Sequence, residues 1–115
     1  FVAHNILYNL VTILVINQLQ SIYSTADTLA LEPFIDKWKP FGLEVSEVDG
    51  HNHYEIFKAC NNIKAPRNKP LFIIANTIKG KNVSFMENNT LWHYRSPQGH
   101  EYKLAIAELE KKDER

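Results

Sequence analysis

Three short apolar runs, spaced far apart, limit what this chain can fold into. They are LVTILVI at residues 10–16, LEVSEV at 43–48 and LFIIA at 71–75. The first and third are nearly continuous in apolar residues, as in strands buried on both faces, and the second alternates, as in a strand with one drier face. Parallel strands need crossovers of about a dozen residues or more, and both intervening segments are long enough. The runs therefore predict an α/β fold with a parallel sheet and right-handed crossovers.

Amphipathic helices are predicted between and after these strands. Pro33 suits a first helical turn with Glu32 near its positive end, and Pro40 and Gly42 end that helix. Asn52 suits the N-cap of a second helix, and residues 98–112 predict a terminal one. The apolar positions expected to face the core are Leu31, Phe34, Ile35 and Trp38, then Ile56, Phe57, Cys60 and Ile63, then Tyr102, Leu104, Ala105 and Leu109.

A sheet of three strands is thin and leaves edges to be covered. The chain starts at Phe1 without an initiator Met, and residues 1–9 resemble the end of a helix that feeds the first strand. The uninterrupted apolar run after Asn9 is about eight residues long, against about 18 needed to span a membrane. We therefore expect a fragment or one subunit of a split protein, completed by a larger chain or partner, with no membrane anchor.

Composition excludes some classes of partner. Thirteen Lys and Arg residues balance thirteen Asp and Glu residues among the 115, so no net charge favours nucleic acid or an acidic membrane surface. The single cysteine, Cys60, cannot form an intramolecular disulfide and suits a reducing compartment. The expected location is the cytoplasm, and neither nucleic acid nor a membrane is an expected partner.

Candidate site residues follow the predicted strands, because ligands bind beyond the carboxyl ends of parallel strands. Asn17 follows the first strand and offers a hard amide oxygen of the kind that Mg²⁺ accepts. A turn-forming Asn that bonds to its own backbone is the alternative, and spacing alone favours it. Asp49, His51 and His53 follow the second strand, but they lack a second ligand cluster, and Asp-Gly is first of all a turn signal.

The segment after the third strand, residues 77–97, is long for a connection and rich in aromatic residues. Gly80 and Lys81 resemble the end of a phosphate loop, but the upstream glycine and following Ser or Thr are missing. His93 is either an acid–base group or a structural loop histidine, and rarity alone favours the second. Phe85 and Trp92 are expected to anchor the loop.

Together, these segments resemble the amino-terminal, thiamine-diphosphate-binding part of transketolase. NLVTILVINQLQS is similar to the family's strand and metal-binding turn, LEPFIDKWKPFGLEVSEVDGH to its next helix and strand, and ANTIKGKNVSFMENNTLWHYRSP to the loop that runs to the active-site histidine. The likeness extends from Phe1 to about Leu109, three segments in order. It implies a three-layer α/β thiamine-diphosphate-binding fold, of which residues 1–115 form an incomplete part, the carboxy-terminal half of the domain.

The resemblance also implies a site. The family's divalent cation is held by an Asp in an upstream Gly-Asp-Gly, by the Asn of this turn and by a backbone carbonyl two residues later. Asn17 and Leu19 match the last two, whereas the Gly-Asp-Gly would precede Phe1 and the activating glutamate belongs to the carboxy-terminal half. Ile78 matches the isoleucine that packs against the cofactor, and His93 matches the catalytic histidine near the diphosphate. The implied cofactors are thiamine diphosphate and Mg²⁺ or Ca²⁺.

The implied activity is a transferase of the pentose phosphate pathway, moving a two-carbon ketol unit from a ketose phosphate to an aldose phosphate. The implied partners are sugar phosphates and a carboxy-terminal transketolase half or partner subunit, in a homodimer or heterotetramer; this piece alone is expected to be inactive. Val15, where an Asp is common, and Ile22-Tyr23, in place of an Asp/Gly-rich turn, depart from the family pattern. The alternatives are another thiamine-diphosphate enzyme, such as deoxyxylulose-phosphate synthase, and a non-catalytic remnant that associates with a partner.

Overall fold

A computed structural model describes residues 1–20, 23–61 and 68–113. The chain divides into two compact units, which we call the sheet unit (Phe1–Ile16 and Leu31–Thr77) and the loop unit (Asn17–Ala30 and Ile78–Arg115). The elements of the sheet unit are β1 (Val11–Ile16), α2 (Phe34–Trp38), the 3₁₀ turn η1 (Lys39–Phe41), β4 (Glu44–Asp49), α3 (His53–Asn61) and β5 (Leu71–Asn76). Those of the loop unit are β2 (Leu19–Gln20), β3 (Tyr23–Ser24), α1 (Thr25–Thr28), η2 (Thr90–His93) and α4 (His100–Asp113).

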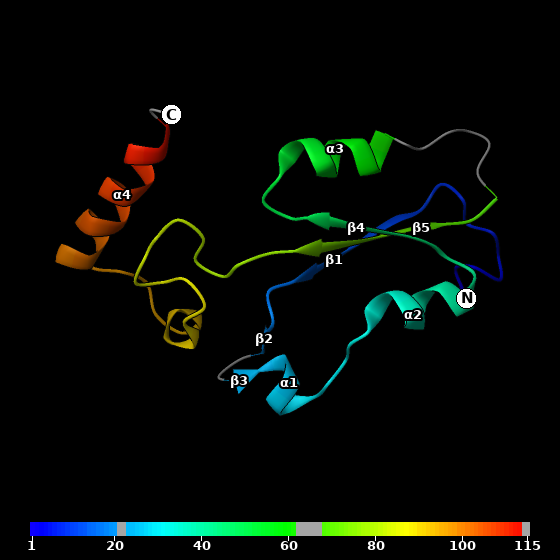
Figure 1. Cartoon of the computed structure of the whole chain (residues 1–115), viewed down its shortest axis with the longest axis horizontal. Coiled ribbons are helices and arrows are strands. Elements are labelled where there is room, and N and C mark those ends of the chain that lie inside the picture. The colour runs from blue at the N-terminus through cyan, green and yellow to red at the C-terminus, as the bar shows by residue number, and fades with distance from the viewer. Residues whose placement is uncertain (21–22, 62–67, 114–115) are drawn as a thin grey trace. The chain divides into compact units, whose positions relative to one another are not determined.

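The three predicted strands form one parallel sheet in the order β1-β5-β4, as the crossover argument requires (Figure 1). The register runs from Val11 opposite Leu71 to Ile16 opposite Asn76, and from Glu44 opposite Leu71 to Asp49 opposite Asn76. The strands therefore end level with one another, so the segments that follow them start at the same edge of the sheet.

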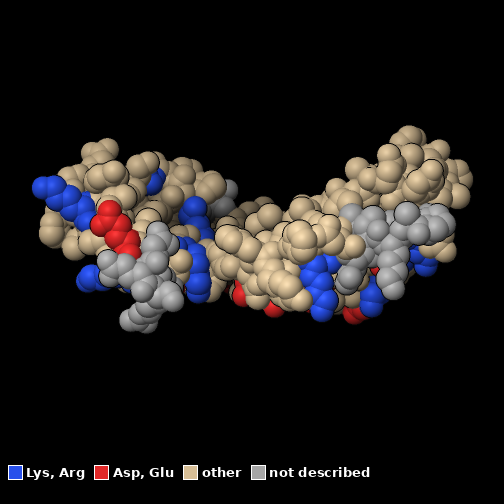
Figure 2. Space-filling view, turned by 90° about the horizontal axis from the view of Figure 1, so that it is seen from above, with Lys and Arg blue, Asp and Glu red and all other residues tan. Residues whose placement is uncertain are grey.

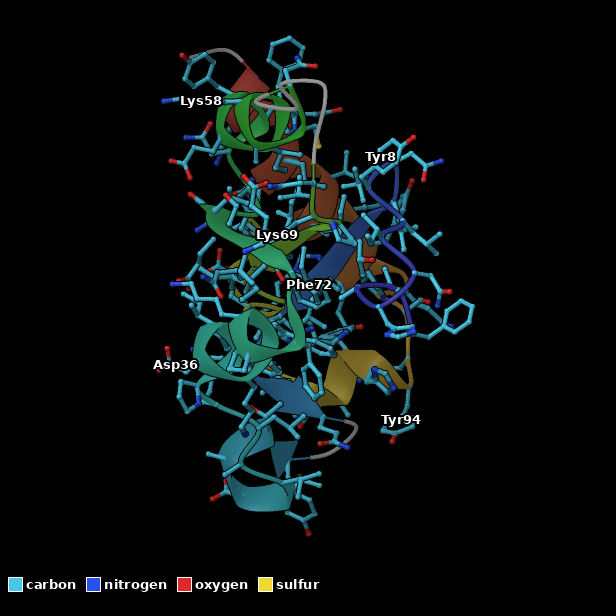
Figure 3. The ribbon with its side chains drawn as sticks, turned by 90° about the vertical axis from the view of Figure 1, so that its right-hand side faces the viewer. Tyr8, Asp36, Lys58, Lys69, Phe72 and Tyr94 are labelled. Carbon is cyan, nitrogen blue, oxygen red and sulfur yellow. The ribbon has the colours of Figure 1, made fainter. Side chains whose placement is uncertain are left out.

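Helices cover both faces of the sheet, which confirms the layered α/β prediction. Figure 3 shows α3, which carries Lys58, on one side of the sheet and α2, which carries Asp36, on the other, with Phe72 between them. On the α3 side, Ala59 packs with the buried Ile73 of the central strand. On the α2 side, the ring of Trp38 stacks on Phe72 with centroids 4.5 Å apart.

Two of the predicted helix boundaries are those of the structure, whereas Pro33 precedes α2 and is not in its first turn. The side-chain oxygen of Asn52 accepts hydrogen bonds from the backbone N–H groups of Tyr54 (3.1 Å) and Glu55 (3.2 Å), which makes it the N-cap of α3. Gly42 follows η1 with a φ of +85°, a left-handed conformation that suits glycine. Local sequence signals therefore set both boundaries.

Some core predictions were wrong. Residues 10–16 were expected to be buried on both faces, yet Ile13 is 49% and Val15 63% exposed, because β1 is an edge strand. Leu31 precedes α2 and is exposed, since the helix starts only after Pro33. Phe57 is 65% exposed, because α3 turns its Ile56, Ala59 and Cys60 side to the sheet. Ile63 and Ile22 lie outside the described residues.

The loop unit contains elements that the sequence analysis did not predict. Strands β2 and β3 form an antiparallel pair, and the Ser24 hydroxyl caps α1 by accepting the N–H of Asp27 at 3.1 Å. Ser-x-x-Asp is a helix-start signal that could have revealed α1. Helix α4 was predicted, but of its expected apolar positions only Ala105 is buried. No helix within the described residues is long and apolar enough to cross a membrane.

Candidate functional site

The turn after β1 is built around Asn17, which is half-buried. Its side-chain oxygen accepts a hydrogen bond from the backbone N–H of Leu19 at 3.1 Å. Gln18, between them, has a φ of +58°, and its carbonyl accepts the N–H of Thr25 at 2.9 Å. The hydrogen bond between the Asn17 side chain and the Leu19 backbone forms the turn, as expected for an Asn at this position in the sequence.

This role leaves Asn17 able to bind a cation as well. An amide oxygen has two lone pairs, and the Leu19 N–H occupies one of them. The amide oxygen of Asn17 and the carbonyl of Leu19 are hard, neutral ligands of the type that Mg²⁺ takes, but they bring no negative charge. The residues of this turn therefore fit part of a divalent cation site, and the negatively charged ligands would have to come from outside this turn.

The long loop after β5 is anchored by its aromatic residues, as predicted. Trp92 is only 9% exposed, its indole N–H donates to the carbonyl of Phe85 at 2.9 Å, and the two rings meet edge to face with centroids 5.2 Å apart. Val83 is buried in the same loop. These contacts hold the loop in one folded conformation.

Backbone geometry closes the loop on itself. Gly80 has a φ of +70°, and a Cβ at this position would lie 2.6 Å from the carbonyl oxygen of Met86, so another residue would clash. The N–H of Asn88 donates to the carbonyl of Lys79 at 3.0 Å. The glycine that resembled the end of a phosphate loop thus serves a tight turn.

A contact between Ser84 and Glu108 joins this loop to α4. The backbone N–H and the hydroxyl of Ser84 both donate to the Glu108 carboxylate, the hydroxyl at 2.7 Å. The backbone hydrogen bond above all, then the hydroxyl, lowers the pKa of Glu108 below its usual value. Sequence patterns gave no signal for this pair, which is 24 residues apart.

His93 is the last residue of η2, and its side chain is exposed. Its ring meets that of Tyr94 edge to face, with centroids 4.8 Å apart. The guanidinium of the neighbouring Arg95 lies 4.5 Å above the Trp92 ring and also pairs with Glu101. The imidazole of His93 is therefore exposed and accessible to a ligand, and the contacts of Trp92 and Arg95 hold the residues on either side of it.

The four predicted site residues, Asn17, Leu19, Ile78 and His93, all belong to the loop unit. Asn17 and Leu19 are joined by their hydrogen bond, and Ile78 is half-buried at the start of the long loop. Within the described residues, no hydrogen bond, ion pair or ring contact connects His93 to the turn at Asn17. Their roles as metal, cofactor and catalytic residues remain predictions.

The segment with Asp49, His51 and His53, considered above as an alternative metal site, forms a turn. The carboxylate of Asp49 accepts the backbone N–H of His51 at 2.9 Å, as the Asp-Gly signal indicated. Across the described residues, no group of three His, Cys, Asp or Glu side chains could hold a metal. A hollow of about 250 Å³ at the carboxyl end of the sheet is lined by Glu32, Asp36 and Glu47, none of which was predicted to be a site residue.

Comparison with known proteins identifies relatives of one kind. The chain is 41% identical over 106 residues to an apulose-4-phosphate transketolase subunit of Actinobacillus succinogenes, covering 92% of this chain and 37% of that protein. It is 42% identical over 95 residues to a 6-deoxy-6-sulfo-D-fructose transketolase subunit of a Clostridium species, covering 83% and 34%. Human transketolase is 33% identical over 85 residues, 74% of this chain and 13% of that one. No family model matches the chain.

A solved structure supports the same relationship. The transketolase of Campylobacter jejuni superimposes with a TM-score of 0.67 at 27% identity, over 77% of this chain and 14% of that one. The chain spans a little over a third of the length of the curated bacterial subunits that it matches. Sequence and fold agree, and the chain therefore belongs to the transketolase family.

Proposed function

We propose that this chain is the part of a transketolase that holds thiamine diphosphate through a divalent cation and presents His93 to the substrate. The observation that carries the proposal is the pairing of a preformed Asn17–Leu19 turn with an anchored loop ending in an exposed histidine. Both follow carboxyl ends of parallel strands, where α/β folds place ligands. The proposed cofactors are thiamine diphosphate and Mg²⁺, with Ca²⁺ as a substitute.

The chain's own residues have separate roles in this proposal. Asn17 and Leu19 supply two neutral oxygens to the cation, and Ile78 packs against the cofactor. His93 donates a hydrogen bond to the oxygen on which negative charge develops and moves a proton at that oxygen. When bound, thiamine diphosphate supplies the electron sink that allows a carbon–carbon bond beside a carbonyl to break.

The proposed reaction is the transfer of a two-carbon ketol unit between sugar phosphates. Two bacterial relatives are named as transketolase subunits, which supports a partner chain, in a heterotetramer or, within a longer chain, a homodimer. A non-catalytic remnant is the second candidate, since Val15 places an exposed apolar side chain close to the metal turn. Cofactor binding separates the two candidates.

The test uses a chimera in which this chain replaces the 106 aligned residues of the Actinobacillus succinogenes subunit. Thiamine diphosphate affinity is measured by calorimetry across a magnesium titration. We expect Asn17→Ala to weaken magnesium-dependent binding, whereas Asn61→Ala, an exposed residue at the end of α3, leaves it unchanged. Equal affinity of the Asn17 variant at every magnesium concentration would refute the metal role.

A further inference from the structure

Helix α4 contacts the long loop through two glutamates on one of its faces. Glu101, in the first turn, pairs with the guanidinium of Arg95, and Glu108 accepts two hydrogen bonds from Ser84. The two glutamates lie seven residues apart, which is about two helical turns, so their side chains share a face of the helix. The helix therefore contacts the loop on both sides of His93.

The contact between Glu108 and Ser84 is well suited to fixing the backbone of the loop. One hydrogen bond comes from the backbone N–H of Ser84 and the other from its hydroxyl. The lowered pKa of Glu108 keeps its carboxylate ionised at neutral pH, and hydrogen bonds to an ionised group are about twice as strong as those between neutral groups. Because two bonds reach the same carboxylate, both the position and the direction of the chain at Ser84 are set by α4.

A short series of contacts leads from Ser84 to His93. The carbonyl of the next residue, Phe85, accepts the indole N–H of Trp92 at 2.9 Å, and the two rings meet edge to face. The side-chain amide of Asn89 donates to the same carbonyl at 3.4 Å. His93 directly follows Trp92 at the end of η2. A shift of the backbone at Ser84 would therefore move the turn that carries the imidazole.

We infer that Glu108 and Ser84 are positioning residues for His93, which act through the loop and hold the imidazole where it reaches the reacting oxygen. The inference rests on the proposed function, in which His93 acts where negative charge develops. The ring of His93 is exposed, so its place depends on the backbone of η2 more than on packing. A displacement of about 1 Å can cost a catalytic group about 10²-fold in rate. Loss of the contact should therefore lower turnover more than substrate binding.

Steady-state kinetics test the inference in the chimera with the Actinobacillus succinogenes subunit, assembled with that enzyme's partner subunit. We expect Glu108→Ala to lower kcat by about tenfold or more, with a change in the KM for the sugar phosphates of less than about twofold. Glu108→Gln keeps one acceptor oxygen and should give an intermediate kcat. Glu110→Ala, at an exposed position of the same helix, is the control and should leave both constants unchanged. Parent-level kcat in a folded Glu108→Ala variant overturns the inference.

A double-mutant cycle separates positioning from a general loss of stability. In a chimera that already carries His93→Ala, Glu108→Ala should lower kcat by less than about twofold, because the group that it positions is gone. Where Glu108→Ala does not fold, Glu108→Gln takes its place in the cycle. An equal loss with and without His93 would overturn the inference and leave the proposed function standing. Parent-level turnover of His93→Ala alone would refute both.

Hydrogen exchange measured by mass spectrometry on the same chimera gives a readout that does not depend on turnover. In Glu108→Ala, the peptide that contains residues 85–94 should exchange faster, because the N–H groups of Trp92 and Tyr94, which donate within this turn, open more often. Exchange in β5 should match that of the parent, which shows that the variant is folded. Unchanged exchange of the loop peptide in a folded variant overturns the inference.

Discussion

At the scale of single residues, Ser84 and Glu108 give a pH-dependent prediction. The hydrogen bonds from Ser84 lower the pKa of Glu108, so the ionised carboxylate is the form that the folded chain favours. A carboxyl group whose pKa is lower when folded stabilises the fold above its usual pKa of 4.5 and loses that contribution as the pH falls through the folded value. Ser84→Ala should therefore lower the melting temperature at pH 7.

The difference between Ser84→Ala and the parent chain should shrink as the pH falls below about 4.5. Melting curves from pH 7 to pH 3 measure it, with Ser46→Ala on β4 as the control. A difference that stays constant over this range would show that the carboxylate does not carry the effect.

His93 gives the second prediction at this scale, and it rests on the proposed function. His93→Ala in the chimera should reduce kcat by about 10²–10⁴-fold, the usual contribution of a general acid–base group. The melting temperature should change little, because the ring is exposed and its one ring contact within the described residues is the edge-to-face contact with Tyr94. His53→Ala, another exposed histidine, is the control. Parent-level turnover in a folded His93 variant would leave this residue without a catalytic role.

At the scale of elements, α3 depends on its cap. Asn52 satisfies two otherwise unpaired N–H groups at the start of the helix, those of Tyr54 and Glu55. Asn52→Ala should cost about 1 kcal/mol of unfolding free energy, within the measured range of about 0.5–2. Asn61→Ala at the other end of α3 should be close to neutral. Urea unfolding followed by circular dichroism measures both, and equal losses would show that the cap is not specific.

Strands and helix boundaries could be predicted because local residues set them. The apolar runs gave all three strands of the sheet to within about a residue at each end, and Asn52 and Gly42 gave the ends of helices. Burial could not be predicted as well, since it depends on neighbours. The apolar sequence of β1 does not show that this strand lies at an edge of the sheet. The amphipathic pattern of α3 likewise did not show that Phe57 would be exposed.

In the candidate site, too, some features could be predicted from local residues and others could not. Asn17 and the anchors of the long loop could be found from type and spacing, because a turn amide and buried aromatics act locally. The pairing of Ser84 with Glu108 and the bond from Asp49 to Glu55 depend on tertiary approach, which one sequence does not encode in a recognisable pattern. The resemblance to transketolase supplied the roles of Ile78 and His93, which spacing alone left open.

At the scale of the whole molecule, the proposed function gives the chain only part of a catalytic constellation. In the proposed function it supplies two neutral oxygens, those of Asn17 and Leu19, and a histidine, and among the described residues no group of three His, Cys, Asp or Glu side chains could hold a metal. Figure 2 shows Lys and Arg side chains spread among uncharged and acidic ones on the face it presents, rather than gathered into one basic surface. Charge therefore gives no support to nucleic acid as a partner.

The most direct test of the account is whether this chain can replace its counterpart in a working transketolase. The chimera with the Actinobacillus succinogenes subunit, together with that enzyme's partner subunit, is assayed for ketol transfer with thiamine diphosphate and Mg²⁺ present. We predict turnover by the assembled chimera and none by purified residues 1–115, because catalysis needs the complete, oriented set of groups. A folded, assembled chimera that transfers no ketol unit, or transfer by residues 1–115 alone, would contradict the account.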